Sequence, residues 1–150
     1  MATTKYNGKS IQELASYTDS IRITHADLTA SATSETITKT VKAGQQVRGV
    51  AFKVHTAFDG GATSALKLDV GDGDDADGYI DNEEIHADAT EVLFGPALDG
   101  LLTGKTYAAD DTIDILFSAT GANVSVLDAG EVEIFFNIVS LNDVSSGFAD

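Results

Sequence analysis

Apolar residues recur at every second position along most of this chain. This spacing is typical of β-strands that bury one face, because successive side chains point to opposite sides of a sheet. Val50, Phe52 and Val54, for example, alternate with smaller or more polar residues. We expect strands within seven such segments: residues 21–24, 36–41, 50–55, 65–70, 112–118, 124–126 and 131–141.

Glycine-containing turns separate the predicted strands. They lie at residues 43–44, 59–61, 77–78, 99–100, 120–121 and 129–130. Many short strands joined by such turns predict an all-β fold, a two-sheet antiparallel sandwich, in place of alternating strands and helices. We expect one sandwich domain over residues 20–150, and we favour an eight-stranded jelly roll over an immunoglobulin-like arrangement.

The first 19 residues have a different pattern. Residues 1–9 lack an apolar period and predict an extended arm. Ser10 and Glu13 have the spacing of a capping box, in which each side chain binds a free backbone N–H of the other at a helix start. Ile11 and Leu14 then share one side of a short predicted helix over residues 11–17. We therefore predict an N-terminal arm and short helix over residues 1–19.

The last predicted strand is apolar on both faces in its second half. Its outward positions begin with two glutamates but continue with Phe135, Val139 and Leu141. One interpretation is a central strand covered on both sides by its own chain, for instance by the N-terminal helix. The other is a strand with one face against a neighbouring subunit.

Charge is distributed unevenly along the sequence, whose net charge is −15. Residues 1–67 contain eight Lys/Arg and five Asp/Glu, for a charge of +3, and residues 68–150 contain one Lys and nineteen Asp/Glu, for −18. Because so acidic a chain repels the phosphate backbones of nucleic acids, we expect no nucleic-acid partner. The asymmetry predicts either a surface charged for solubility or a polar molecule that docks with its basic end first.

The acidic segment 69–91 contains a possible calcium loop. With Gly78 as the turn glycine, the spacing places Asp75, Asp77, Asp81 and Glu84 at ligand positions of such a loop. The first ligand position holds Gly73 instead of an aspartate, and no helix pair flanks the loop, so this is not an EF-hand. The alternative is a solvated acidic loop whose aspartates cap turns.

Motifs for catalysis and membrane insertion are missing from the sequence. The three histidines are scattered, and neither a nucleophile elbow nor a phosphate-binding glycine loop is present. The chain has no cysteine, no apolar run long enough to span a bilayer, and no apolar leader at its start. We therefore predict a protein that is not an enzyme, has no catalytic residues and no cofactor other than the possible Ca²⁺, and does not insert into membranes.

Four stretches resemble a group of small virion structural proteins of tailed bacteriophages. They are residues 58–61 (FDGG), 66–80 (LKLDVGDGDDADGYI), 107–115 (YAADDTIDI) and 129–131 (AGE), the last leading into the terminal strand. The resemblance covers roughly residues 46–141. It implies a jelly-roll-like sandwich and a structural component of the head or tail, and it transfers no catalytic residues.

The resemblance implies a head decoration, or cement, protein located at the capsid surface of the virion. Such a protein binds the major capsid protein or other virion proteins and stabilises the shell, often as a homotrimer. We expect the arm and the terminal strand to make the contacts, through Lys5, Tyr6, Lys9, Ile11, Leu14, Phe135, Val139 and Leu141. The alternative is a tail or fibre-associated protein that binds a receptor glycan through its loops. A bacterial surface-layer or pilus module is a third class, and the missing leader counts against it.

Overall fold

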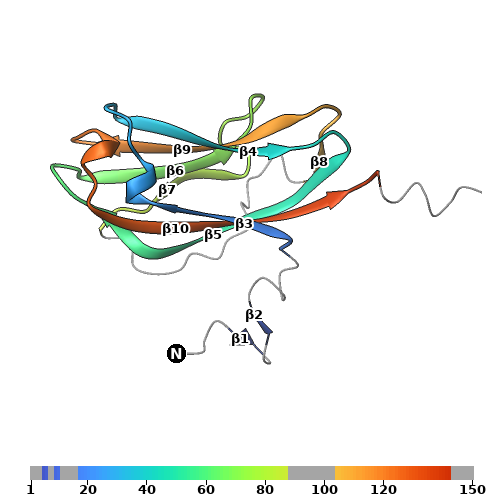
Figure 1. Cartoon of the computed structure of the whole chain (residues 1–150), viewed down its shortest axis with the longest axis horizontal. Helices are drawn as coiled ribbons and strands as arrows, with labels where there is room; N and C mark the ends of the chain where they lie inside the picture. The colour runs from blue at the N-terminus through green and yellow to red at the C-terminus, as the bar shows by residue number, and fades with distance from the viewer. Residues whose placement is uncertain (1–4, 7–8, 11–16, 88–103, 143–150) are drawn as a thin grey trace, which may run out of the picture.

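Two four-stranded antiparallel sheets face each other in the computed structural model (Figure 1). The structure describes residues 5–6, 9–10, 17–87 and 104–142. The strands are β1 (Lys5–Tyr6), β2 (Lys9–Ser10), β3 (Asp19–Thr24), β4 (Ser34–Val41), β5 (Gln45–Asp59), β6 (Ala65–Gly71), β7 (Ile80–Glu84), β8 (Lys105–Thr106), β9 (Asp111–Thr120) and β10 (Ala129–Ser140); two short 3-10 helices are η2 (His25–Asp27) and η3 (Val124–Val126).

The strand order confirms the predicted jelly roll. One sheet has the order β3-β10-β5-β8 and the other β4-β9-β6-β7. The strands pair as a nested set, β3 with β10, β4 with β9, β5 with β8 and β6 with β7. The chain from β3 to β10 is therefore one long hairpin, and rolling it up adds the β5–β10 and β6–β9 pairs that complete each sheet.

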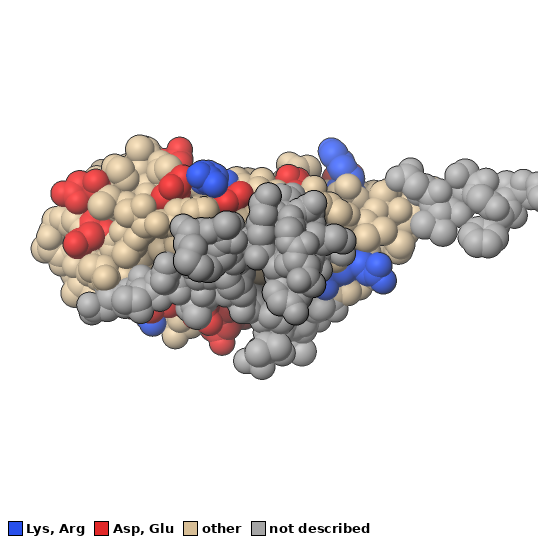
Figure 2. All heavy atoms as spheres, turned by 90° about the horizontal axis from the view of Figure 1, so that it is seen from below, with Lys and Arg blue, Asp and Glu red and all other residues tan. Residues whose placement is uncertain are grey.

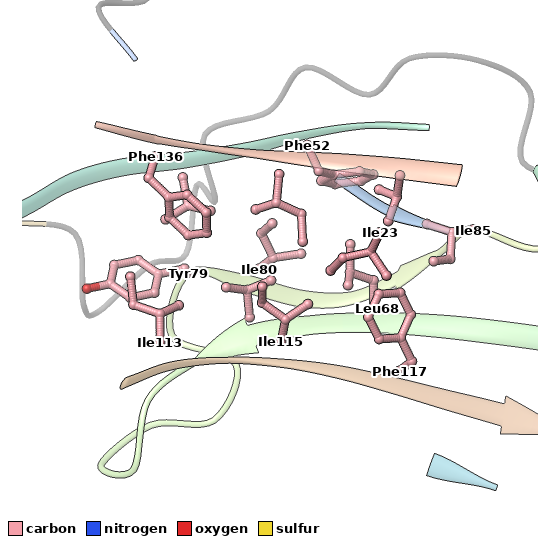
Figure 3. Close-up of a cluster of buried hydrophobic side chains, with 14 of the residues drawn as sticks. Ile23, Phe52, Leu68, Tyr79, Ile80, Ile85, Ile113, Ile115, Phe117 and Phe136 are labelled. Atoms are coloured by element: carbon pink, nitrogen blue, oxygen red, sulfur yellow. The ribbon is translucent and has the colours of Figure 1, made fainter. Parts of the chain in front are cut away.

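The core lies between the two sheets and is made by the inward residues of the alternating pattern (Figure 3). Phe52 and Phe136 from one sheet face Leu68, Ile115 and Phe117 from the other. Each of these five side chains is at most 3% exposed. Burial of one such side chain stabilises a fold by roughly 1.5–3 kcal/mol, so this cluster holds the sheets together without disulfides.

Most strand predictions are confirmed, but one is wrong and several elements were not predicted. Residues 124–126 form a 3-10 helix, because an alternating run of three residues is too short to establish a strand. The short strands β7 and β8 were not predicted. Residues 5–6 pair with residues 9–10 as β1 and β2, a pairing that was not predicted. Of the helix predicted over residues 11–17, positions 11–16 lie outside the described residues.

The two ends of the sandwich are built differently. At the "glycine end", the β5–β6 and β9–β10 connections contain Gly60, Gly61 and Gly121, and Gly130 is the second residue of β10; all four have positive φ. Gly130 shows why glycine is needed, since a Cβ on this residue would lie 2.3 Å from the ring of the buried Phe58. At the "acidic-loop end", residues 72–79 connect β6 to β7, beside the β4–β5 and β8–β9 connections.

The uneven charge of the sequence does not become two oppositely charged halves of the molecule. Strand β10, from the acidic half of the chain, lies between β3 and β5, and β9 lies between β4 and β6. The two halves therefore interleave in both sheets, which argues against docking by a separate basic end. Within the described part of the chain, no helix is long and apolar enough to cross a membrane.

Candidate functional site: an anchored acidic loop

The acidic loop, residues 72–79, is held to the sandwich by one buried carboxylate. The Asp72 side chain is 0% exposed. Its Oδ2 accepts hydrogen bonds from Lys105 Nζ at 2.7 Å and from the Tyr107 hydroxyl at 2.8 Å. Its Oδ1 accepts the backbone N–H groups of Asp74 at 2.9 Å and Asp75 at 3.1 Å. One side chain therefore shapes the turn and ties it to the segment that contains β8.

Two tyrosines extend this network into the core. The hydroxyl oxygens of Tyr79 and Tyr107 lie 3.0 Å apart, and both residues are buried. Figure 3 shows the Tyr79 ring among the core side chains, beside Ile113. The Lys105 ammonium also lies 5.0 Å from the centre of the Tyr107 ring, where a cation is attracted to the ring face. The network thus joins the loop, the β8 segment and the hydrophobic core.

The electrostatics of the network favour an ionised Asp72. Burial alone would raise the pKa of Asp72, but the hydrogen bonds from Lys105, Tyr107 and two backbone amides outweigh burial and lower it. The hydrogen bonds to Asp72 and Asp74 raise the pKa of Lys105. Burial, together with the bonds to Tyr79 and Asp72, raises the pKa of the Tyr107 hydroxyl, which therefore stays a proton donor.

The remaining carboxylates of this end repel one another. A side-chain hydrogen bond with Asp77 raises the pKa of Asp75. Burial raises the pKa of Asp69, and the nearby charges of Asp81 and Asp77 raise it further. Asp74 projects outward with 83% of its side chain exposed, although it also contacts Lys105 at 2.8 Å. The anchored loop therefore presents excess negative charge at one end of the sandwich.

The four predicted calcium ligands do not all point the same way. Asp75 and Asp77 lie in the loop, and Asp81 lies in β7. Glu84, at the end of β7, instead accepts the backbone N–H groups of Leu66 at 2.9 Å and His86 at 3.0 Å. Among the described residues, no group of three or more His, Cys, Asp or Glu side chains is placed to hold a metal ion. Calcium binding by Asp75, Asp77, Asp81 and Glu84 stays a prediction.

The terminal strand is central, and its outward phenylalanine contacts its own chain. Strand β10 lies between β3 and β5, with Ser20 and Ala51 opposite Phe135. Phe135 is only 8% exposed, and its ring centre lies 5.9 Å from that of Tyr17. This contact favours cover by the chain itself at Phe135. Val139 is half-buried, and Leu141 is 40% exposed.

The remaining predicted contact residues precede the sandwich. Lys5 and Tyr6 form β1 and pair with β2, which contains Lys9. The side chains of these three residues are not among those that the structure describes. Ile11 and Leu14 lie outside the described residues altogether.

Beside Phe135, the outer face of the β3-β10-β5-β8 sheet carries a self-contained ionic network. Arg22 contacts Glu131 at 3.1 Å and Glu133 at 3.0 Å, and His55 lies 2.8 Å from Glu133. In the part of this face that is not grey, Figure 2 shows most Asp and Glu side chains toward the glycine end and Lys and Arg side chains at several points along the length. The charged groups in the network are already paired with one another.

A cavity of about 300 Å³ lies between the edges of β3 and β4. Its lining includes Asp19, Lys39 and Lys42. Lys39 forms an ion pair with Asp19, and Lys42 contacts Asp110 at 2.9 Å. Among the described lining residues there is one carboxylate and no histidine, so these side chains do not assemble an acid–base pair.

Comparisons with protein-family models, with curated proteins and with solved structures found no match for this chain. The fold and the site geometry are therefore the observations on which a functional proposal can rest, together with the sequence resemblance.

Sequence reasoning missed the anchor, although a signal was present. Asp72 lies between two glycines directly after a buried strand, a position where aspartate commonly accepts backbone N–H groups. Lys105 is the only Lys or Arg among residues 68–150, so one of the many carboxylates of this half is expected to form an ion pair with it. Nothing in the spacing indicated that this carboxylate would be Asp72, 33 residues earlier.

Proposed function

We propose that this chain is a structural protein of a tailed-phage virion, a decoration protein that docks on the head shell and acts without catalysis. The jelly-roll strand order supports the proposal, because it is the fold that the resemblance implies. The observation that carries it is the Asp72 anchor. The most distinctive segment of the resemblance is built as a fixed, outward-facing loop, which suits recognition of another surface.

The exposed apolar side chains suggest where docking occurs. Only two large apolar residues are exposed in the described part of the chain, Val126 at 42% and Leu141 at 40%. Val126 lies at the glycine end, and Leu141 follows β10 at the acidic-loop end. Leu141 therefore shares its end of the sandwich with the anchored loop, and we place the contact with the shell there.

Binding to heads tests the proposal directly. Purified full-length chain is added to expanded heads that lack it, and bound copies are counted after sedimentation and located by electron microscopy. We expect saturable binding in symmetric copy number and heads that resist heating better when the chain is bound. Failure to bind heads, combined with binding to host cells, would replace the proposal with the receptor-binding alternative.

A pair of matched variants locates the docking surface. Leu141→Glu should leave the melting temperature nearly unchanged but weaken binding to heads, because a charge would be buried in the contact. Val126→Glu makes the same change at an equally exposed position at the other end and should bind normally. Equal binding by both variants would remove the terminal strand from the contact.

Calcium binding is tested separately from docking. If Asp75, Asp77 and Asp81 bind Ca²⁺, excess Ca²⁺ should raise the melting temperature of the wild-type chain and not that of Asp77→Asn. Identical melting curves in Ca²⁺ and in EDTA would remove the prediction and leave the docking proposal untouched.

A further inference from the structure

Strand β4 is an open edge of its sheet. It pairs with β9 through eight consecutive residue pairs without a bulge. No described residue pairs with its other side, since the sheet order is β4-β9-β6-β7. An uninterrupted edge of this kind exposes a row of backbone N–H and C=O groups to which another strand can bind.

The other three edges of the sandwich are less suited to pairing. Strand β8 has two residues. Strand β7 contains Asn82 with a φ of 55° and is paired to β6 with a register shift. Strand β3 is shorter than β4 and carries the charged Asp19 and Arg22. Strand β4 contains no proline, and its outward side chains are the uncharged Ser34, Thr36, Thr38 and Thr40, all exposed.

The hydrogen bonds to β9 show which backbone groups are free. The carbonyl of Thr33 accepts the N–H of Ala119 at 2.7 Å, so the backbone N–H and C=O groups of residue 33 point toward β9. Because antiparallel strands alternate between residues bonded to one neighbour and residues directed at the other, the odd-numbered residues of β4 bond to β9. The free groups therefore belong to residues 34, 36, 38 and 40.

We propose that two copies of this chain pair through their β4 strands, antiparallel and about a two-fold axis at Ile37. This register places Thr36 opposite Thr38 of the copy, and Ser34 opposite Thr40. These are the residues whose backbone groups are free, so each such pair can exchange two hydrogen bonds. The two β4–β9–β6–β7 sheets would become one continuous sheet.

Side-chain complementarity selects this register over its neighbours. With the axis at Ile37, Glu35 lies opposite Lys39 of the copy, and Ile37 lies opposite Ile37. These are the non-hydrogen-bonded positions, where opposite side chains approach most closely. Moving the axis by one residue to Thr36 or Thr38 keeps the hydrogen-bonding phase but places Glu35 and Lys39 opposite residues without charge.

Lys39 and Glu35 are the features that could oppose pairing, since inward-directed charges at an edge discourage it. The charge of Lys39 is already neutralised by an ion pair with Asp19, and its ammonium lies 5.3 Å from the centre of the Phe136 ring. Glu35 Oε2 accepts the backbone N–H of Ala30 at 2.9 Å, which leaves its other carboxylate oxygen for a partner. In the proposed register Lys39 also meets a glutamate of the copy. The two charges therefore select a complementary partner strand instead of excluding all of them.

Thr38→Pro tests the pairing itself. The proline removes a backbone N–H that is directed away from β9, so β4 should keep its own sheet contacts. Two-fold symmetry doubles the loss, and we expect the dimer dissociation constant to rise at least about tenfold. Analytical ultracentrifugation of the full chain over a range of concentrations measures this, with circular dichroism to confirm folding.

Charged variants test the register and remain informative if the proline variant does not fold. Residues 36 and 38 face each other across the proposed axis, so T36K/T38K and T36E/T38E place like charges opposite and should dissociate the dimer. T36E/T38K places opposite charges together and should remain dimeric. In either neighbouring register one of these positions faces itself, so T36E/T38K would dissociate as well.

The proposal does not depend on the virion role. It is overturned if the wild-type chain stays monomeric at its highest soluble concentration. It is also overturned if the chain forms a trimer, as the resemblance implies, whose mass none of the β4 variants changes. Dissociation of T36E/T38K to the same extent as T36K/T38K would overturn the register.

Discussion

The two ends of the sandwich close the same fold by different physical means. At the glycine end the chain turns tightly, and backbone and ring atoms approach positions that have room for hydrogen alone. At the acidic-loop end Gly71 is packed just as closely, since an added Cβ would lie 2.0 Å from the Asp75 carbonyl oxygen. Here, in addition, a buried carboxylate, an ammonium and two phenols hold a longer connection in place. Close packing therefore serves both ends, and the charged network is what distinguishes the acidic-loop end, so pH and single-atom changes should affect that end more.

The largest effect is expected from Gly130→Ala at the glycine end. The added Cβ would lie 2.3 Å from the Phe58 ring, and the φ of +132° is unfavourable for any residue with a side chain. Strain and overpacking together should lower the free energy of unfolding by about 4 kcal/mol. Urea denaturation measures this. Gly73→Ala is the control, because its Cβ would meet no atom within 4 Å, and a comparable loss there would contradict the steric explanation.

Asp72→Ala should have the next largest effect, at the other end. It leaves the Lys105 ammonium, the Tyr107 hydroxyl and two backbone N–H groups without their acceptor. We expect a loss of about 3 kcal/mol in the free energy of unfolding. Asp74→Ala removes another carboxylate bound to Lys105, but one that is 83% exposed, and should cost less than about 1 kcal/mol. Equal losses in the two variants would show that burial does not matter here.

The pH dependence of stability should separate the ends further. Because the pKa of Asp72 is lowered by folding, its contribution is present above the ordinary aspartate range near about pH 4 and is lost as pH falls through the lowered pKa. Asp69 and Asp75, whose pKa values are raised, act in the opposite sense and favour the folded state on mild acidification. Melting temperatures between neutral pH and pH 3 should fall less steeply below pH 4 in Asp72→Asn than in the wild type. Parallel curves would contradict the assignment.

The smallest effect is expected at the glycine end, from Thr63→Val. The Thr63 hydroxyl oxygen is buried and has no hydrogen-bond partner among the described atoms. Replacing it with a methyl group should raise the free energy of unfolding by up to about 1 kcal/mol. Thr112→Val, which removes a hydroxyl that donates to Asp114 at 2.8 Å, should lower it slightly. Destabilisation by Thr63→Val would indicate a partner for the hydroxyl.

Regular alternation of apolar and polar residues made the long strands predictable. The short strands β7 and β8 lack this alternation, so the sequence did not reveal them. Val50, Phe52 and Val54 are inward residues of β5, as their spacing predicts, and the inward set of β10 is likewise confirmed. Strand β7 has one buried apolar residue, Ile80, in an acidic run, and β8 is defined only by its pairing with Gln46 and Val47. Such short strands form because an adjacent strand of the sheet pairs with them, and the sequence pattern of five or fewer residues does not reveal that pairing.

The candidate site was predictable in place but not in geometry. The density of aspartates located the loop, and a calcium-loop spacing then assigned its side chains by position. In the structure Asp72, which the calcium-loop spacing left out, is the carboxylate at the centre of the hydrogen-bond network. Glu84, which that spacing included, accepts backbone N–H groups of β6 and His86 instead. The partner of Asp72 lies on a segment distant in sequence, and only the rolled topology brings the two together.

The nested pairing of the strands has a consequence for how this protein is made. Arg22 and Glu131, whose strands lie side by side, are 109 residues apart in the sequence, and β10 fills the place between β3 and β5. A nascent chain therefore lacks an inner strand of one sheet until the whole span from β3 to β10 has left the ribosome. Contacts so distant in sequence slow folding to roughly milliseconds to seconds, and the unfinished sheet exposes strand edges meanwhile.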